Sequence, residues 1–169
     1  MINIVKNLID DGYKATIIEC GHGALLVNEF LSTPGASQLV LYGKQPYSKE
    51  IQHFDYPSTE DVRSVSQEFV YYVMRSELTR NHLQFGYKTI TFVTSFQLGD
   101  ETKLCHGYFG IGQFIGQFGD GAERGIQLLA LAHQFLGGGG IVPQRGVFGL
   151  GVQFVQAQQC TIPVKDASG

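Results

Sequence analysis

Cysteine is scarce in this chain, and the few cysteines present exclude several classes of small protein. Cys20, Cys105 and Cys160 are an odd number and lack the paired spacing of zinc ligands. We therefore expect neither a disulfide framework nor a zinc site, and the sequence predicts no metal and no cofactor. Free cysteines are typical of a reducing compartment, which predicts a cytoplasmic location.

Charge is also sparse, at 16% of the 169 residues, and the net charge is −3. Lysine and arginine are scattered, so no basic surface for a phosphate backbone is predicted and nucleic acid is not an expected partner. The apolar stretch 126–136 is interrupted by glutamine and histidine and is too short to span a membrane. The chain does not begin with a charged and then apolar secretory signal. A soluble protein with no membrane partner is the expectation.

The length is that of one domain, and helical and strand patterns alternate along it. Apolar residues at helical spacing predict helices near 4–9, 25–30, 69–78 and 123–136. Runs rich in β-branched residues predict strands near 15–19, 39–42, 88–94 and 104–111. Ser48 and Ser66 stand where the N-caps of a short helix and of the long helix are expected. Helices interleaved with strands predict an α/β fold, a three-layer α/β/α sandwich with a mixed β-sheet.

The chain changes character after its first 136 residues. Four consecutive glycines, 137–140, form a flexible joint, and an apolar period of two residues follows over 148–154. We therefore assign 1–136 to an α/β domain and 137–169 to a Gly-rich joint with a C-terminal strand extension of the same domain. That strand lies either at an edge of the same sheet or in a neighbouring subunit, because a free apolar edge invites pairing. A homo-oligomer is expected on this ground.

The most informative segment is the turn that follows the first predicted strand. It places Cys20 between a β-branched strand and an apolar helix, with Gly21 and Gly23 allowing a close turn. Amides at the start of a helix lower the pKa of a nearby thiol, and the thiolate is the reactive form, so Cys20 is a candidate nucleophile. The alternative is a small residue packed beneath the turn. For Glu19, the alternatives are to orient a base or to accept hydrogen bonds from the turn amides.

Three motifs follow one another between residues 19 and 52. They are Glu19-Cys20-Gly21-His22-Gly23, Pro34-Gly35-Ala36-Ser37 and Tyr47-Ser48-Lys49-Glu50. In this order and spacing they resemble the C-terminal domain of the CinA family, which includes nicotinamide mononucleotide amidases. The family pattern runs Glu-Ser-Cys-Thr-Gly-Gly, Pro-Gly-Ser-Ser and Tyr-Ser-Asn-Glu-Ala-Lys. The resemblance covers about residues 1–136 and implies the fold of that family.

The resemblance implies a serine nucleophile and a lysine that activates it, but this chain has Cys20 and Gln52 at those two positions. Glutamine cannot take a proton. Residues 96–100 replace most of the family's Gly-Pro loop, and Gly121 stands where the family has an arginine. These departures speak against the family's own reaction.

Other family positions are kept. The second serine after Pro-Gly is Ser37, the tyrosine is Tyr47, and the threonine at a strand end is Thr94. The predicted substrate-binding residues are Gly21, Gly23, Ser37 and Thr94.

A cysteine nucleophile also offers a way to do without the lysine, because a thiol ionises far more readily than a hydroxyl. His22 is a candidate base, and the amides of 21–23 are candidate oxyanion donors. Lys49, three residues before Gln52 and on the same face of a helix that begins at Ser48, is another candidate base. The predicted catalytic residues are Cys20, His22, Tyr47 and Lys49.

Two functions remain open from the sequence. One is an amidohydrolase that cleaves a small amide, such as nicotinamide mononucleotide, through Cys20. The other is a degenerate homologue that keeps a small-molecule pocket, with a nicotinamide nucleotide as a candidate ligand, but not the reaction. Loss of the lysine and of the Gly-Pro loop favours the second.

Overall fold

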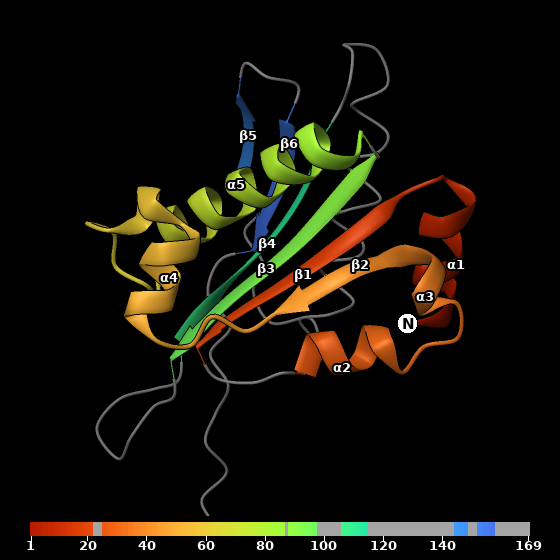
Figure 1. Cartoon of the computed structure of the whole chain (residues 1–169), viewed down its shortest axis with the longest axis horizontal. Coiled ribbons are helices and arrows are strands. Elements are labelled where there is room, and N and C mark those ends of the chain that lie inside the picture. The colour runs from red at the N-terminus through yellow and green to blue at the C-terminus, as the bar shows by residue number, and fades with distance from the viewer. Residues whose placement is uncertain (22–24, 87, 98–105, 115–143, 149–151, 158–169) are drawn as a thin grey trace, which may run out of the picture.

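The computed structural model describes residues 1–21, 25–86, 88–97, 106–114, 144–148 and 152–157. Their strands form one sheet, and their helices pack around it (Figure 1). The helices are α1 (Ile2–Asp10), α2 (Leu25–Leu31), α3 (Ala36–Leu39), α4 (Lys49–Asp55), the single 3-10 turn η1 (Pro57–Thr59) and α5 (Gln67–Phe85). The strands are β1 (Lys14–Gly21), β2 (Val40–Lys44), β3 (Thr89–Gln97), β4 (His106–Phe114), β5 (Gln144–Phe148) and β6 (Val152–Ala157). Among the described helices, none combines the length and the apolar character that crossing a membrane requires.

The six strands lie in the order β2-β1-β3-β4-β6-β5. The first three in this order run parallel to one another, and β4, β6 and β5 join antiparallel, which confirms the predicted mixed sheet. In the register of β1 and β3, Ile17 lies beside Phe92 and Ile18 beside Val93. Because successive side chains of a strand point to opposite faces, the first pair faces one layer of helices and the second pair faces the other.

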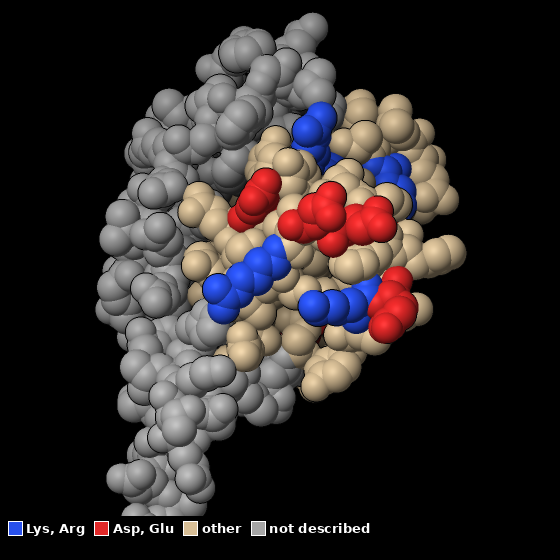
Figure 2. Space-filling view, turned by 90° about the vertical axis from the view of Figure 1, so that its left-hand side faces the viewer, with Lys and Arg blue, Asp and Glu red and all other residues tan. Residues whose placement is uncertain are grey.

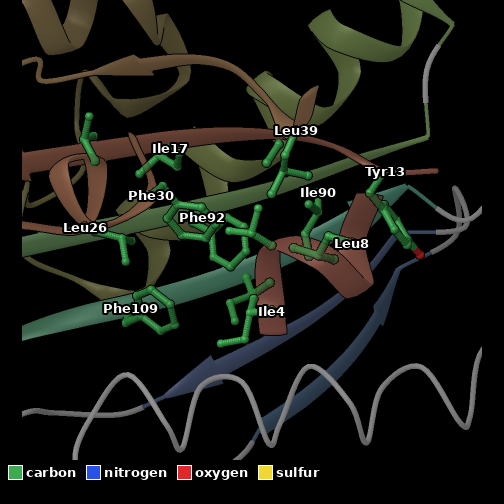
Figure 3. Packing of buried hydrophobic residues seen from close by; sticks show 14 residues of the cluster. Ile4, Leu8, Tyr13, Ile17, Leu26, Phe30, Leu39, Ile90, Phe92 and Phe109 are labelled. Carbon is green, nitrogen blue, oxygen red and sulfur yellow. The ribbon is translucent and has the colours of Figure 1, made fainter. Parts of the chain in front are cut away.

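One face of the sheet packs against α1 and α2. The rings of Phe30 in α2 and Phe92 in β3 lie 4.9 Å apart, and Leu8 of α1 packs in the same cluster (Figure 3). Burial of such side chains is the main favourable term in folding, at about 25 cal/mol per Å² of apolar surface. Among the described residues, this cluster contains more buried side chains than the cluster on the other face of the sheet.

The other face packs against α5. The predicted apolar stripe of this helix is confirmed, because all of its members are buried: Phe69, Val70, Val73, Met74 and Leu78. Glycines in β4 let the helix approach closely, since a Cβ at Gly112 would lie 2.6 Å from the Met74 sulfur. Helices therefore cover both faces of the sheet, as Figure 1 shows, and the three-layer sandwich is confirmed.

Both predicted N-caps are present. The Ser48 hydroxyl accepts a hydrogen bond from the Ile51 amide at 3.3 Å, and the Ser66 hydroxyl accepts one from the Phe69 amide at 3.1 Å. Gly86 ends α5 in the left-handed conformation, with φ of 63°, where glycine carries no steric penalty.

Two details of the predicted strands were wrong. Leu39 closes the short helix α3 instead of beginning a strand, because this one-turn helix places Ala36 and Leu39 in buried positions. The alternating stretch 148–154 belongs to two strands, not one: β5 ends at Phe148, β6 begins at Val152, and these two residues pair. The two-residue apolar period is the same in both strands, so the sequence pattern does not show where β5 ends and β6 begins. The helix predicted over 123–136 lies outside the described residues.

Candidate functional site

The three parallel strands β1, β2 and β3 all end at the same side of the sheet, which is called the carboxyl edge below. β1 ends at Gly21, β2 at Lys44 and β3 at Gln97, and the chain runs from β2 into α4 beside this edge (Figure 1). Ligands of open α/β sheets bind at the carboxyl ends of the strands. The candidate site is therefore the region around this edge.

Glu19 and Cys20 are adjacent in β1 but belong to different faces of the sheet. The two oxygens of the Glu19 carboxylate accept hydrogen bonds from the amides of Leu26 at 2.9 Å and Val27 at 3.0 Å, which begin α2. Of the two alternatives for Glu19, the structure supports the bonding of backbone amides. Cys20 instead packs in the core on the α5 side.

This arrangement corrects the expectation of an acidified thiol. Cys20 is 1% exposed, and burial, followed by the negative charges of Glu77, Asp55 and Glu19, raises the pKa of its thiol to about 12. The amides at the start of α2 do not lower this pKa, because they bond the Glu19 carboxylate on the opposite face. At neutral pH the side chain is therefore a neutral thiol, and the prediction of a reactive thiolate at Cys20 is wrong.

Gly21 is held in the left-handed region, with φ of 92°. A Cβ at this position would lie 2.2 Å from the carbonyl oxygen of Phe96 in the paired strand β3. Glycine is therefore required here for close packing of two backbones. The neighbouring candidates His22 and Gly23 lie outside the described residues.

The remaining predicted residues are not gathered around Cys20. Thr94 is the register partner of Glu19 and so shares its face of the sheet, opposite to Cys20. Ser37 lies on the surface just before β2, whose first residue, Val40, pairs with the beginning of β1. Cys20 lies about five residues further along β1, on the order of 16 Å away at about 3.3 Å per residue. Tyr47 is 76% exposed.

Gln52, at the position of the family's lysine, points into the molecule. It is 3% exposed, and its amide nitrogen donates hydrogen bonds to the carbonyls of Pro46 at 2.9 Å and Tyr47 at 3.3 Å. Lys49 is exposed whereas Gln52 is buried, so the expectation that both lie on the same face of α4 is wrong. Residues three apart on a helix differ by about 60° in direction, which is enough to separate a buried side chain from an exposed one.

A surface pocket of about 250 Å³ opens beside α4 at this edge. Lys49 and His53, one helical turn apart in α4, form one wall, and Gln97 reaches it from the end of β3. The segment between η1 and α5 supplies the other lining residues, which are Glu60, Val62, Arg63, Ser64 and Val65. The pocket has both positive and negative side chains in its lining.

The chain is similar in structure to proteins of known structure. No family model matches the sequence, and no curated protein does. A competence-damaged protein (CinA) superfamily protein from Klebsiella pneumoniae has 19% identity and a TM-score of 0.54, over 80% of this chain and 92% of that one. A CinA superfamily protein from Escherichia coli has 13% identity and a TM-score of 0.52, over 64% of this chain and 66% of that one. The competence/damage inducible protein CihA from Agrobacterium tumefaciens has 15% identity and a TM-score of 0.51, over 76% and 85%.

The chain has a CinA-like fold. The resemblance inferred from the three motifs is thereby confirmed for the fold. The match to the Escherichia coli protein spans slightly less than two thirds of that chain. At these identities the likeness concerns the CinA-like architecture alone.

This chain also contains a buried polar cluster that was not predicted from the sequence. The carboxylate of Glu77, fully buried on α5, accepts hydrogen bonds from the hydroxyls of Tyr42 and of Tyr56, the latter at 2.7 Å. It also pairs with Lys44 at 3.2 Å and Arg80 at 3.0 Å. The cluster ties the last strand residues of β2 to α5 and to the end of α4.

This cluster sets the electrostatics beneath Cys20. Burial first, and then the hydrogen bond to Glu77, raises the pKa of Tyr42 above its usual range; burial and the charge of Glu77 raise that of Tyr56. The sequence did contain a sign of the cluster. Glu77 and Asn81 occupy positions in line with the apolar stripe of α5, where a polar residue requires partners.

Proposed function

We propose that this chain is a CinA-like protein that lacks the amidase reaction and keeps a pocket for a small molecule. The observation that carries the proposal is the state of Cys20, which stands at the position of the family's nucleophile. An attacking cysteine needs its thiolate form and access to substrate. A thiol that is 1% exposed, with its pKa raised to about 12, meets neither condition at neutral pH.

The environment of Gln52 supports the same proposal. Its side chain has no titratable proton, and its amide holds the chain at the beginning of α4 through the carbonyls of Pro46 and Tyr47. Lys44, the lysine nearest in the sequence before α4, is paired with Glu77. Lys49 lines the surface pocket and not the interior that contains Cys20. Within the described residues, no lysine is in a position to activate Cys20.

The pocket beside α4 is the proposed binding site. It lies at the edge of the sheet where α/β folds bind ligands, and it is lined by charged side chains that stay available to a ligand. Nicotinamide mononucleotide is the first compound to test, as substrate and as ligand. The proposal includes a homo-oligomer, because the apolar alternation over 148–154 invites strand pairing, and a cytoplasmic location, because the few cysteines are typical of a reducing compartment.

The test is release of ammonia from nicotinamide mononucleotide at pH 7.5, with an active CinA-family amidase as positive control. We expect no release above background from the wild type, and none from Gln52→Lys. The cysteine-dependent amidohydrolase is the competing function. Turnover by the wild type that Cys20→Ala abolishes would establish that function and overturn the proposal.

A further inference from the structure

The pocket beside α4 is lined by charged groups of both signs. Lys49 and His53 project from one helical face, and Glu60 and Arg63 come from the segment that precedes α5. Figure 2 looks onto the side of the molecule that carries α4 and shows acidic and basic side chains lying next to one another there. Neither sign of charge dominates this face.

These groups are not paired with one another. In the described part of the chain the ion pairs are those of Glu77 with Lys44 and Arg80, and neither involves the pocket. The pKa of Glu50, an exposed carboxylate on α4, is lowered mainly by hydrogen bonds with its own backbone and with Ser48, and less by the charges of His53 and Lys49. The lining charges are therefore available to a ligand that carries the complementary charges.

The number and sign of these charges indicate which charges a complementary ligand carries. Lys49 and Arg63 provide two positive groups, Glu60 provides one negative group, and Val62 and Val65 provide apolar surface in the same lining. A ligand that matches all of them has two anionic groups, one cationic group and a short aliphatic stem. A dianion without a cationic group would place negative charge next to the Glu60 carboxylate. An amino acid with no net charge has a single carboxylate, so either Lys49 or Arg63 would lack a partner on the ligand.

We infer that the ligand of this pocket is an acidic α-amino acid, whose two carboxylates pair with Lys49 and Arg63 and whose ammonium group pairs with Glu60. The inference rests on the proposed small-molecule pocket and names its ligand class. The volume of about 250 Å³ suits it, because it is below the roughly 300–1,000 Å³ typical of pockets for drug-sized ligands. The side chains involved lie near the surface, so each pair contributes modestly to affinity.

Titration calorimetry on the full chain at low ionic strength tests this inference with four ligands. L-glutamate is expected to bind most tightly. Glutarate, which lacks the ammonium group, and L-glutamine, which lacks one carboxylate, are each expected to bind at least threefold more weakly. Nicotinamide mononucleotide is the fourth ligand.

Variants assign the contacts. Glu60→Gln should bind glutamate no better than the wild type binds glutarate, and Arg63→Gln should remove the preference for glutamate over glutamine. Asp61→Asn is the matched control, since Asp61 is an exposed neighbouring carboxylate that does not line the pocket, and it should leave all affinities unchanged. Circular dichroism of each variant verifies that the fold is intact.

Equal affinity for glutamate and glutarate, or an unchanged glutamate affinity in Glu60→Gln, would overturn the inference. Binding of the mononucleotide alone would also overturn it, but would leave the proposed small-molecule function in place. Absence of binding by all four ligands would overturn the inference. Release of ammonia by a Cys20-dependent reaction would overturn the proposed function without changing the measured ligand preference.

Discussion

The carboxylate of Glu19, near the end of β1, accepts a hydrogen bond from the backbone amide of Leu26, in the first turn of α2, at 2.9 Å. Its second oxygen accepts a hydrogen bond from the amide of Val27 at 3.0 Å. The first amides of a helix have no partner within the helix, and a buried carboxylate satisfies two of them and complements the helix dipole. The strand side chain thus fixes where α2 begins and directs these amides away from Cys20.

Removing this carboxylate should destabilise the fold. We expect Glu19→Ala to lower the free energy of unfolding by about 2 kcal/mol, because two helix amides lose a charged acceptor, and Glu19→Gln by about 1 kcal/mol, because one acceptor oxygen remains. Urea unfolding monitored by circular dichroism measures both. Glu29→Gln, on the exposed side of α2, is the control and should change stability by less than about 0.5 kcal/mol. A Glu19 variant that behaves like the control would contradict the capping role.

Gly21 should tolerate a methyl group less well than another glycine of similar backbone conformation. Gly12→Ala places a methyl group at φ of 74° where no atom lies within 4 Å, and should cost about 1–2 kcal/mol from the backbone alone. Gly21→Ala meets the Phe96 carbonyl at 2.2 Å and should cost at least about 2 kcal/mol more. Equal unfolding free energies for the two variants would show that β1 and β3 do not approach this closely.

Cys20 should resist alkylation in the native protein. Because the thiol is buried and its pKa is raised, iodoacetamide at pH 8 should modify it only as fast as the protein opens, and at full speed in 8 M urea. Peptide mapping after timed quenching gives both rates. Native labelling of Cys20 as fast as in urea would restore it as a candidate nucleophile.

Stability should fall in mildly alkaline solution because of the same thiol. Its pKa in the folded state is about 12, above its ordinary value of 9.0, so the stabilisation is fully present below pH 9 and is lost as pH rises toward 12. Over this window the unfolding free energy of the wild type should fall more steeply than that of Cys20→Ala, by up to about 1.4 kcal/mol per pH unit. Urea titrations at pH 8.5, 9.5 and 10.5 measure the slopes. Parallel slopes would mean that the thiol ionises equally well in the folded chain.

The Glu77 cluster should be costly to break. Glu77→Ala leaves the buried hydroxyl of Tyr56 without its acceptor and removes the partner of Lys44 and Arg80, so we expect a loss of about 3–5 kcal/mol. Glu77→Gln, which keeps the shape and one acceptor, should lose about 1–3 kcal/mol. Thermal and urea unfolding measure both losses. Glu68→Gln, an exposed glutamate on the same helix, should cost no more than about 1 kcal/mol, and a Glu77→Ala loss within that range would contradict the role of the cluster.

The sequence by itself determined the architecture. Periodicity, β-branched runs and the caps at Ser48 and Ser66 reflect local preferences of the chain, so they predicted the mixed α/β sandwich and the residues at which α4 and α5 begin. The motifs between residues 19 and 52 also indicated the CinA-like fold that the structural neighbours share. These features depend on short stretches of sequence and need no knowledge of distant contacts.

Only the tertiary structure decided the chemistry of the site. Whether a thiol at the end of a strand is acidified depends on which face it occupies and on what lies beneath it, and here Glu19 takes the helix amides while Cys20 lies in the core near Glu77. The pocket likewise combines α4, the segment before α5 and the end of β3. Such placement results from packing between residues far apart in the chain, and the pKa of a buried group follows from that packing and not from its neighbours in sequence.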